Sequence, residues 1–338
     1  MNDALDIAKS LGINALSAKP FGSGHINDTF KIETSEAPVI LQKINTDIFK
    51  DADGMMDNIK KVTEHLESIG KTTYKVLAYK KPWRVLSFIS GAHSVDVIEE
   101  PAQAFTAGQA FGAFQNDLAS FNVQDLVETI PKFHNTLWRL EELDNAAKAD
   151  KLDRLKTIEP EMKFVDAHRD MAGKVLALMD EGKIPVRITH NDTKINNVML
   201  DDKTGEAVAV VDLDTVMPGC ALYDFGDMVR TATASAEEDE KDLSKVYSKI
   251  EYFESLTKGY LSQAKFLNQY EIDNLVFSGM LITFTIGIRF LADYLAGDVY
   301  FKTDYSDHNL VRARTQFKMI ESIEAQRDAY EKIVKESV

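Results

Sequence analysis

The sequence predicts an α+β fold of two lobes, a strand-rich N-lobe over residues 1–91 and a helical C-lobe over residues 92–338. Three observations support this prediction. Short β-like runs around one helix fill the first ninety residues, and long helical patterns dominate after Gly91. The chain has 338 residues, which is long for one compact core and comfortable for two. We expect the hinge between the lobes near residues 89–94.

The N-lobe prediction depends on four strand-like runs and one helix. Residues 30–33 and 39–42 form a hairpin pattern around the turn at 36–38. Apolar residues recur near helical spacing over 55–69 and stop at Gly70, a residue typical of helix ends. Residues 74–79 and 83–89 then predict two further strands.

The C-lobe prediction depends on long helical patterns. The first begins at Pro101, where the missing N–H of proline costs little in a first helical turn. The acidic run 237–240 predicts a helix start, because carboxylates are favoured at that end of the helix dipole. Four segments are expected to be helical: 101–118, 161–178, 272–295 and 310–338. Two segments do not fit a helix, 184–188 and the apolar run 207–213.

Composition and charge exclude several classes of function. The formal net charge is −15 and no basic stripe is present, which argues against nucleic-acid binding while leaving room for ATP in a local pocket. One cysteine, Cys220, excludes an intramolecular disulfide framework and predicts a buried thiol. No secretory pattern opens the chain, and the uncharged apolar stretch 274–288 is shorter than the roughly 20 residues of a membrane span. We expect a cytoplasmic monomer without a membrane partner.

The most informative segment is 190–197, which has the form H-x-D-x-K-x-x-N. Kinase catalytic loops read H-R-D-L-x-x-x-N, in which the Asp accepts the substrate hydroxyl proton and the Asn holds Mg²⁺. Asp192 and Asn197 have this spacing, and Lys194 could offset charge on the phosphoryl group being transferred. The alternative is a polar loop that only caps a helix.

Two later carboxylates compete for the metal-binding role. Asp212 ends an apolar strand-like run twenty positions after Asp192, and a carboxylate at a strand tip suits Mg²⁺. Asp224 begins a literal D-F-G but precedes a helical run, so we interpret it as a capping or loop-holding carboxylate. Asp214 is expected to be solvated.

Nucleotide contacts are predicted in the N-lobe. Gly22, Ser23 and Gly24 precede a strand, and glycines let a backbone approach phosphates closely, although a plain hairpin turn explains them equally well. Kinases place a lysine on the third strand to meet the phosphates, and the best match here is Gln42, with Lys43 beside it. Adjacent strand residues point to opposite faces, so only one of the two can face the nucleotide.

Six segments together carry a resemblance: 22–27, 41–46, 130–136, 189–194, 211–219 and 289–295. They resemble the aminoglycoside phosphotransferase superfamily over nearly the whole chain, and within it the N-acetylhexosamine 1-kinases, which use ATP to phosphorylate the anomeric hydroxyl of GlcNAc and GalNAc. The resemblance implies a bilobal protein-kinase-like fold and a sugar pocket in the helical lobe. It also implies Asp192 as the base, and Asn197 and Asp212 as Mg²⁺ ligands.

The candidate sugar contacts are His25, Asp192, Lys194 and Arg289. Arg289 lies within an apolar helical run, and a buried arginine nearly always has a partner. The alternative is an ion pair with Asp293, four residues on. Three aromatic residues could line the pocket or belong to the core: Phe133, Tyr294 and Tyr300.

Three functions stay open at this stage. The first is a hexosamine 1-kinase with ATP and Mg²⁺ as cofactors. The second is another small-alcohol kinase of the same fold, acting on an aminoglycoside, choline or homoserine. The third is a nucleotide-binding protein without turnover, against which the complete set of Asp192, Asn197 and Asp212 argues.

Overall fold

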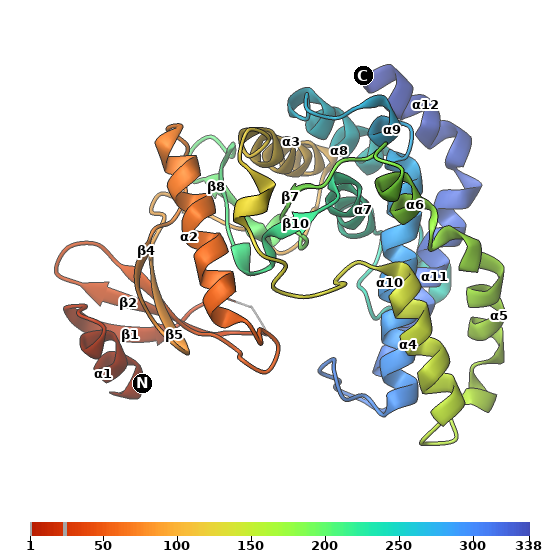
Figure 1. The fold of residues 1–338 in the computed structure, drawn as a ribbon, viewed down its shortest axis with the longest axis horizontal. Helices are drawn as coiled ribbons and strands as arrows, with labels where there is room; N and C mark the ends of the chain where they lie inside the picture. Colours follow the sequence, from red (N-terminus) through yellow and green to blue (C-terminus); the bar gives the residue numbers. More distant parts are fainter. Residues whose placement is uncertain (1, 23–25) are drawn as a thin grey trace. The chain divides into compact units, whose positions relative to one another are not determined.

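The computed structural model describes residues 2–22 and 26–338, and it confirms the α+β fold class (Figure 1). The chain divides into two compact units. The sheet unit comprises Met1–Ser94, Asp117–Pro131 and Asn196–Pro218, and the helical unit comprises Val95–Asn116, Lys132–Ile195 and Gly219–Val338. Asp117–Pro131 and Asn196–Pro218 therefore pack with the N-terminal 94 residues, although the sequence analysis assigned both segments to the C-lobe.

The main sheet of the sheet unit is antiparallel, with the strand order β1-β2-β3-β5-β4. Its strands are β1 (Ala15–Pro20), β2 (Asp28–Thr34), β3 (Val39–Lys43), β4 (Val76–Lys80) and β5 (Trp83–Ser87). The predicted hairpin is β2–β3, and the two later predicted strands are β4 and β5. The register pairs Gln42 of β3 with Thr29 on one side and with Arg84 on the other.

The two faces of this sheet differ in character. Helix α1 (Asn2–Ser10) packs on one face, where Ala4 and Ala8 join a core with Leu41 and Val85. Because side chains alternate along a strand, Gln42 and Arg84 point to the opposite face. Helix α2 (Ala52–Ser68) lies on that face, where Met56 contacts Arg84.

A second sheet in the sheet unit has the order β6-β8-β9. Its strands are β6 (Ala92–His93), β8 (Val198–Asp201) and β9 (Ala207–Val210). Strands β8 and β9 form an antiparallel hairpin that pairs Val198 with Val210. The apolar run ending in Asp212 is thus a strand, as predicted.

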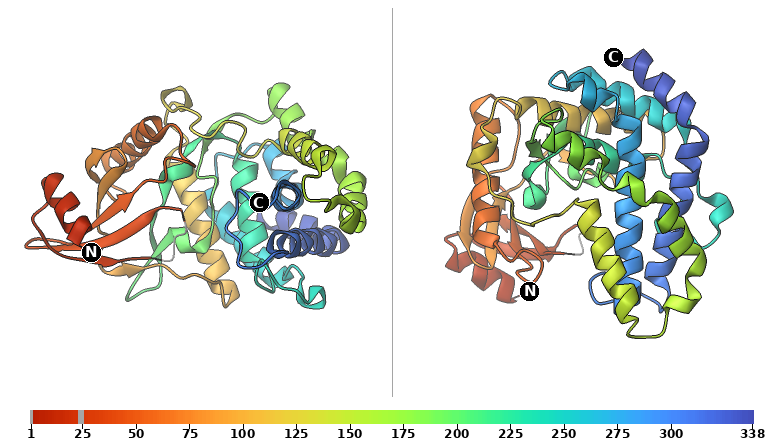
Figure 2. Two further views of the ribbon diagram at one scale, coloured as in Figure 1. Left: turned by 90° about the horizontal axis from the view of Figure 1, so that it is seen from below. Right: turned by 45° about the vertical axis from the view of Figure 1, so that its right-hand side comes forward.

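The helical unit is built around α10 (Leu275–Ala296), which packs against α4, α7 and α11. Figures 1 and 2 show α10 between α4 and α11 from two directions. The remaining helices are α3 (Pro101–Asp117), α4 (Thr136–Ala149), α5 (Glu159–His168), α6 (Lys174–Asp180), α7 (Ala221–Ala232), α8 (Ile250–Gln263), α9 (Gln269–Ile272), α11 (His308–Ala325) and α12 (Arg327–Ser337). Two short strands complete the list, β7 (Arg187–Thr189) and β10 (Met217–Gly219).

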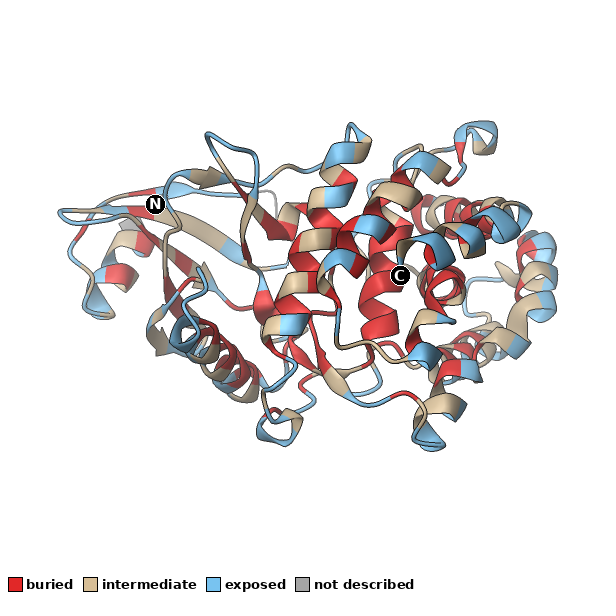
Figure 3. Cartoon of the chain, turned by 90° about the horizontal axis from the view of Figure 1, so that it is seen from above, coloured by how far each residue is buried: buried red, intermediate tan, exposed pale blue. Residues whose placement is uncertain are grey.

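Helix α10 resembles a membrane span in length and composition, with 22 residues and a mean hydropathy of 1.9 in its most apolar window. The helix continues beyond the predicted apolar stretch 274–288 and includes Arg289 and Asp293. However, 83% of that window is buried inside the structure; buried residues are drawn red in Figure 3. A helix that is apolar all round and covered by other helices is the core of the unit.

Several helix predictions need correction. The segment 161–178 is two helices, α5 and α6, separated by a 3₁₀ turn at Arg169–Met171. The segment 310–338 breaks at Gln326 between α11 and α12. The acidic run 237–240 does not begin a helix; Glu238 and Glu240 pair with Arg230 and Lys245 instead. Elements that the sequence analysis did not predict include helices α1, α4 and α8 and strand β1.

Cys220 precedes α7 and is buried, as predicted. Burial raises the pKa of its thiol to about 12, so the thiol is protonated and unreactive at neutral pH.

Candidate active site

The segment with the catalytic-loop spacing is held in place by Asp224, at the start of α7. The Asp224 carboxylate accepts hydrogen bonds from the backbone N–H groups of His190 and Asn191, at 2.8 and 2.7 Å. It also accepts one from the Gln115 side chain at 2.6 Å. All four residues are buried in the helical unit. Asp224 therefore has the loop-holding position that the sequence predicted, although its D-F-G sequence suggests a metal ligand.

Burial raises the pKa of Asp224 to about 6, against the lowering effect of the neighbouring His190 and of these donors. A second carboxylate on α7 extends the support. Asp227 accepts the backbone N–H of Thr193 at 3.1 Å, and the Thr193 hydroxyl donates to the Asp224 carbonyl at 2.7 Å. Asp227 in turn pairs with the buried Arg230 at 2.9 Å. Two turns of α7 thus fix the backbone on either side of Asp192.

Asp192 forms an ion pair with Lys194, with 2.9 Å between carboxylate and ammonium. The side chains of Asp192 and Lys194 are 32% and 45% exposed, so a ligand bound to the helical unit can contact both. Desolvation would raise the pKa of Asp192, but Lys194 outweighs it and the pKa lies below its ordinary value. The Asp192 charge raises the pKa of Lys194. At neutral pH the pair is a carboxylate beside an ammonium ion.

Arg289 is surrounded by aromatic rings. Its guanidinium lies 5.5 Å from the ring centres of Phe133 and Phe301 and 5.7 Å from that of Tyr300. Desolvation lowers its pKa to about 10, helped by the charge of Arg139, so the group is still protonated at neutral pH. These rings contact the candidate substrate residue; that Phe133 and Tyr300 line a sugar pocket stays a prediction.

The alternative ion pair between Arg289 and Asp293 is wrong. Asp293 instead accepts the backbone N–H groups of residues 299–301 at 2.8 to 3.0 Å, and the Asn309 side chain at 2.9 Å. It caps the turn after α10, which a spacing argument on one helix cannot reveal. Tyr294 is buried in the core of the helical unit.

His134 connects the ring cluster to the catalytic loop. Its Nε2 lies 3.3 Å from the Asn191 carbonyl, and its ring contacts those of Phe133 and Tyr223. Burial lowers the pKa of His134 to about 4, so the imidazole is neutral and Nε2–H is the donor. This residue went unnoticed in the sequence, where it stands only within the family-like segment 130–136.

The two predicted metal ligands lie at one end of the β8–β9 hairpin in the sheet unit. The Val211 N–H donates to the Asn197 carbonyl at 2.9 Å, which places Asp212 one residue beyond that bond. Asp212 has a left-handed backbone, with φ of 58°, and leads into a 3₁₀ turn at Leu213–Thr215. One carboxylate and one amide oxygen suit Mg²⁺, which usually takes its other ligands from water and phosphate.

The glycine segment lies in the sequence between β1 and β2, which pair antiparallel. Gly22 has φ of 80°, a left-handed conformation that favours glycine. Ser23, Gly24 and His25 lie outside the described residues. Gln42 shares the α2 face of the sheet with Arg84, and the exposed Lys43 belongs by alternation to the other face.

Asp214 is buried, not solvated as expected. It forms an ion pair with Arg84 at 2.6 Å and accepts the Asn27 side-chain amide at 2.7 Å. The available signal was Arg84 itself, a charged residue within the predicted strand 83–89. An inward-pointing charge on a buried strand requires a partner.

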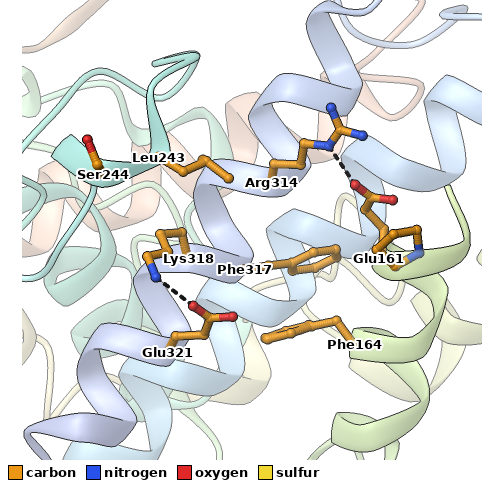
Figure 4. A pocket seen from close by; sticks show the side chains of 9 residues that line it. Glu161, Phe164, Leu243, Ser244, Arg314, Phe317, Lys318 and Glu321 are labelled. Carbon is orange, nitrogen blue, oxygen red and sulfur yellow. Dashed lines mark hydrogen bonds and ion pairs between the residues drawn. The ribbon is translucent and has the colours of Figure 1, made fainter.

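A cavity in the helical unit lies elsewhere. It has a volume of about 370 Å³ and lies between α5 and α11, as Figure 4 shows. Its walls include the stacked rings of Phe164 and Phe317 and the ion pair between Glu161 and Arg314. Of the predicted substrate residues that the structure describes, Asp192, Lys194 and Arg289, none lines this cavity.

The comparison with family models gives one match. Residues 17–251 match the model of the phosphotransferase enzyme family APH. The match includes the glycine segment, the catalytic loop and Asp212.

Solved structures resemble the whole chain at low sequence identity. Choline kinase from Cryptosporidium parvum Iowa II is 15% identical with a TM-score of 0.60, covering 98% of this chain and 97% of that one. Aminoglycoside 2'-phosphotransferase-IIIa, in its GDP complex, is 10% identical with a TM-score of 0.64, covering 94% and 97%. ADP-bound aminoglycoside phosphotransferase APH(2'')-Ib is 14% identical with a TM-score of 0.58, covering 94% and 97%. At these identities the likeness establishes the fold.

Proposed function

Because this chain belongs to the phosphotransferase enzyme family APH, we propose that it is an ATP- and Mg²⁺-dependent kinase that phosphorylates the anomeric hydroxyl of N-acetylhexosamines. The observation that carries the kinase reaction is the Asp192–Lys194 pair, on a loop that Asp224 and Asp227 hold by its backbone. The match of the fold to an ADP-bound phosphotransferase supports the nucleotide part of the proposal.

The candidate residues have separate roles in phosphoryl transfer. The ionised Asp192 carboxylate accepts the proton of the substrate hydroxyl and orients its oxygen, and Lys194 offsets charge on the phosphoryl group. An anomeric hydroxyl is more acidic than an ordinary alcohol, so a carboxylate of low pKa is a sufficient base. Asn197 and Asp212 would hold Mg²⁺, which neutralises charge on the phosphates.

The cations of the helical unit favour a neutral sugar over a cationic amine. Arg289 is half-buried and protonated, and Lys194 stands beside Asp192. A quaternary ammonium or polyamine substrate would be repelled by these charges, whereas the hydroxyl and amide groups of a hexosamine accept hydrogen bonds from them. Phe133 and Tyr300, which contact Arg289, offer apolar surface for the sugar ring and the acetyl methyl.

A small-alcohol kinase of another specificity is the second candidate. Proteins with the same fold include choline kinases and aminoglycoside phosphotransferases, whose substrates are cationic. The overall charge of −15 is compatible with such a substrate. The two candidates differ in the charge of the substrate: an N-acetylhexosamine is neutral, whereas choline and aminoglycosides are cationic.

A coupled assay of ADP release over a panel of substrates tests the proposal. We expect turnover with GlcNAc and GalNAc and weaker turnover with glucose and galactose, because a site that binds an amide rejects analogues lacking it. Phosphorus NMR of the product should show coupling to the anomeric proton, which identifies a sugar 1-phosphate.

Two other outcomes would replace the proposal. A 6-phosphate product, or turnover of choline, homoserine or an aminoglycoside but of no hexosamine, would establish the second candidate. Nucleotide binding without turnover of any alcohol in the panel would favour a protein that binds ATP for another purpose.

A further inference from the structure

Arg84 is the largest fully buried side chain among the described residues, with 1% of its surface exposed. It is the second residue of β5, and its guanidinium contacts side chains from three other elements. It forms the ion pair with Asp214 at 2.6 Å, donates through Nε to the Gln42 amide oxygen at 2.9 Å, and lies 3.7 Å from the Met56 sulfur. A cation buried to this degree is held in one position.

Gln42 orients this cation. Its amide nitrogen donates to the Thr29 hydroxyl at 3.0 Å, which leaves its oxygen to accept from Arg84. A lysine at this position has only donors and would place a second positive charge against Arg84. The departure from the kinase pattern at residue 42 therefore has a structural reason. The Gln42 amide oxygen accepts a hydrogen bond from the arginine on the neighbouring strand.

Asp214 connects the arginine to two loops. Its second oxygen accepts the Asn27 side-chain amide at 2.7 Å, and the Asn27 oxygen accepts the backbone N–H of Asn45 at 3.0 Å. Asn27 stands between the glycine segment and β2. Asp214 lies two residues after Asp212, within the 3₁₀ turn at Leu213–Thr215. One carboxylate thus joins Asn27, just before β2, to the loop of the predicted metal ligand.

Asp212 needs such support, because its backbone is left-handed, with φ of 58°. This conformation is unfavourable for a residue with a Cβ and persists only where the surroundings enforce it. The next turn is fixed by a buried side chain, Asp214, whose two oxygens are both engaged.

We propose that the Arg84–Asp214 ion pair, oriented by Gln42, is a positioning device that sets the backbone of Asp212 and the position of Asn27 for a metal–nucleotide complex. The inference rests on the proposed function, since it takes Asp212 as a metal ligand. Arg84 and Asp214 are positioning residues that act through Asp212 and Asn27. Replacing a buried ion pair by apolar residues is often neutral for stability, so a role in positioning is separable from one in stability.

The test compares two double variants of the full chain. Arg84→Met with Asp214→Leu removes the proposed device. The matched control, Arg187→Met with Glu271→Leu, removes a buried ion pair of 2.7 Å in the helical unit, whose glutamate also accepts a backbone N–H, from Asn268. Binding of Mn²⁺–ADP is measured by electron paramagnetic resonance, with Mn²⁺ standing in for Mg²⁺, and the melting temperature is recorded for each protein.

The first double variant should bind Mn²⁺–ADP at least tenfold more weakly than the wild type, and the control should bind it like the wild type. In turnover, KM for ATP should rise while KM for the sugar stays the same. Equal affinity in all three proteins would overturn the inference and leave the kinase intact. Absence of Mn²⁺–ADP binding by the wild type would instead overturn the proposed function.

A milder variant covers the case in which the first double variant does not fold. Arg84→Lys keeps the buried charge. An ammonium lacks the planar fork of a guanidinium, so it cannot bond Gln42 and Asp214 in the same geometry. We expect a several-fold loss of Mn²⁺–ADP affinity with a folded protein. Wild-type affinity in Arg84→Lys would show that the charge alone suffices and that the proposed orientation by Gln42 is incorrect.

Discussion

Asp192 combines exposure, a negative charge and a rigid backbone, which is what a base for an alcohol requires. Asp192→Asn removes the proton acceptor but keeps the size of the side chain. We expect turnover to fall by about 10²- to 10⁴-fold, with ADP binding and the melting temperature close to those of the wild type. Steady-state kinetics and thermal shifts with ADP measure both. Activity within a few-fold of the wild type would remove Asp192 from the mechanism.

Asp212 and Asp224 should respond in opposite ways to the same substitution. Asp212→Ala should weaken the Mg²⁺ dependence of activity strongly at nearly unchanged melting temperature. Asp224→Ala leaves three buried donors without an acceptor, each at a cost of about 1–3 kcal/mol, so its melting temperature should fall. Titration of activity with Mg²⁺, beside thermal denaturation, distinguishes the two. The reverse pattern would mean that the literal D-F-G is the metal site.

Asp224 also predicts a pH dependence of stability. Its pKa rises from 3.8 to about 6 on folding, so the folded state binds the extra proton between these values. Its contribution to the free energy of unfolding is therefore full below about pH 4 and is lost as the pH rises through about 6. Melting temperatures at pH 4.5 and 7 should differ more in the wild type than in Asp224→Asn. Parallel curves for the two proteins would contradict a raised pKa.

At the scale of elements, the contact between α7 and α10 controls the catalytic loop. A Cβ added at Gly226 of α7 would lie 2.3 Å from the Ser278 carbonyl oxygen of α10. Gly226→Ala should therefore push the two helices apart, at a cost of about 1–3 kcal/mol. It should also lower kcat, because α7 carries Asp224 and Asp227. Denaturant unfolding and kinetics provide the two measurements.

Gly173 supplies a control for that substitution. A Cβ there would meet only the Leu137 side chain, at 3.8 and 3.9 Å, which is an ordinary contact. Gly173→Ala should leave both stability and kcat near the wild-type values. If Gly226→Ala behaves like Gly173→Ala, close packing of α7 on α10 is not what holds the loop.

For the whole molecule we propose a monomer. Exposed large apolar side chains are distributed over many elements among the described residues, for example at Leu16, Val186 and Val299. A net charge of −15 adds repulsion between copies. Sedimentation equilibrium in the presence of ADP and Mg²⁺ should give a mass of 37.9 kDa. A mass of twice that value, independent of salt, would show a stable dimer.

Local patterns predicted the parts of this molecule that local forces determine. The β2–β3 hairpin, helix α2 and the strand before Asp212 follow from apolar periodicity and turn residues, which act over a few neighbours. The spacing in 190–197 predicted the Asp192–Lys194 pair as candidates, since both lie on one short loop. The same reasoning failed where no local signal exists, as at the breaks between α5 and α6 and between α11 and α12.

The sequence by itself determined the fold class, the family and the candidate residues Asp192, Asn197 and Asp212. Only the tertiary structure decided how Asp214, Arg84 and Asp293 are used, because their partners are distant in sequence or attach to backbone groups. Asp214 and Arg84 are 130 residues apart, and their contact depends on the packing of β5 against the turn after β9. A charge is buried only where packing supplies its partner, and packing is a property of the assembled fold.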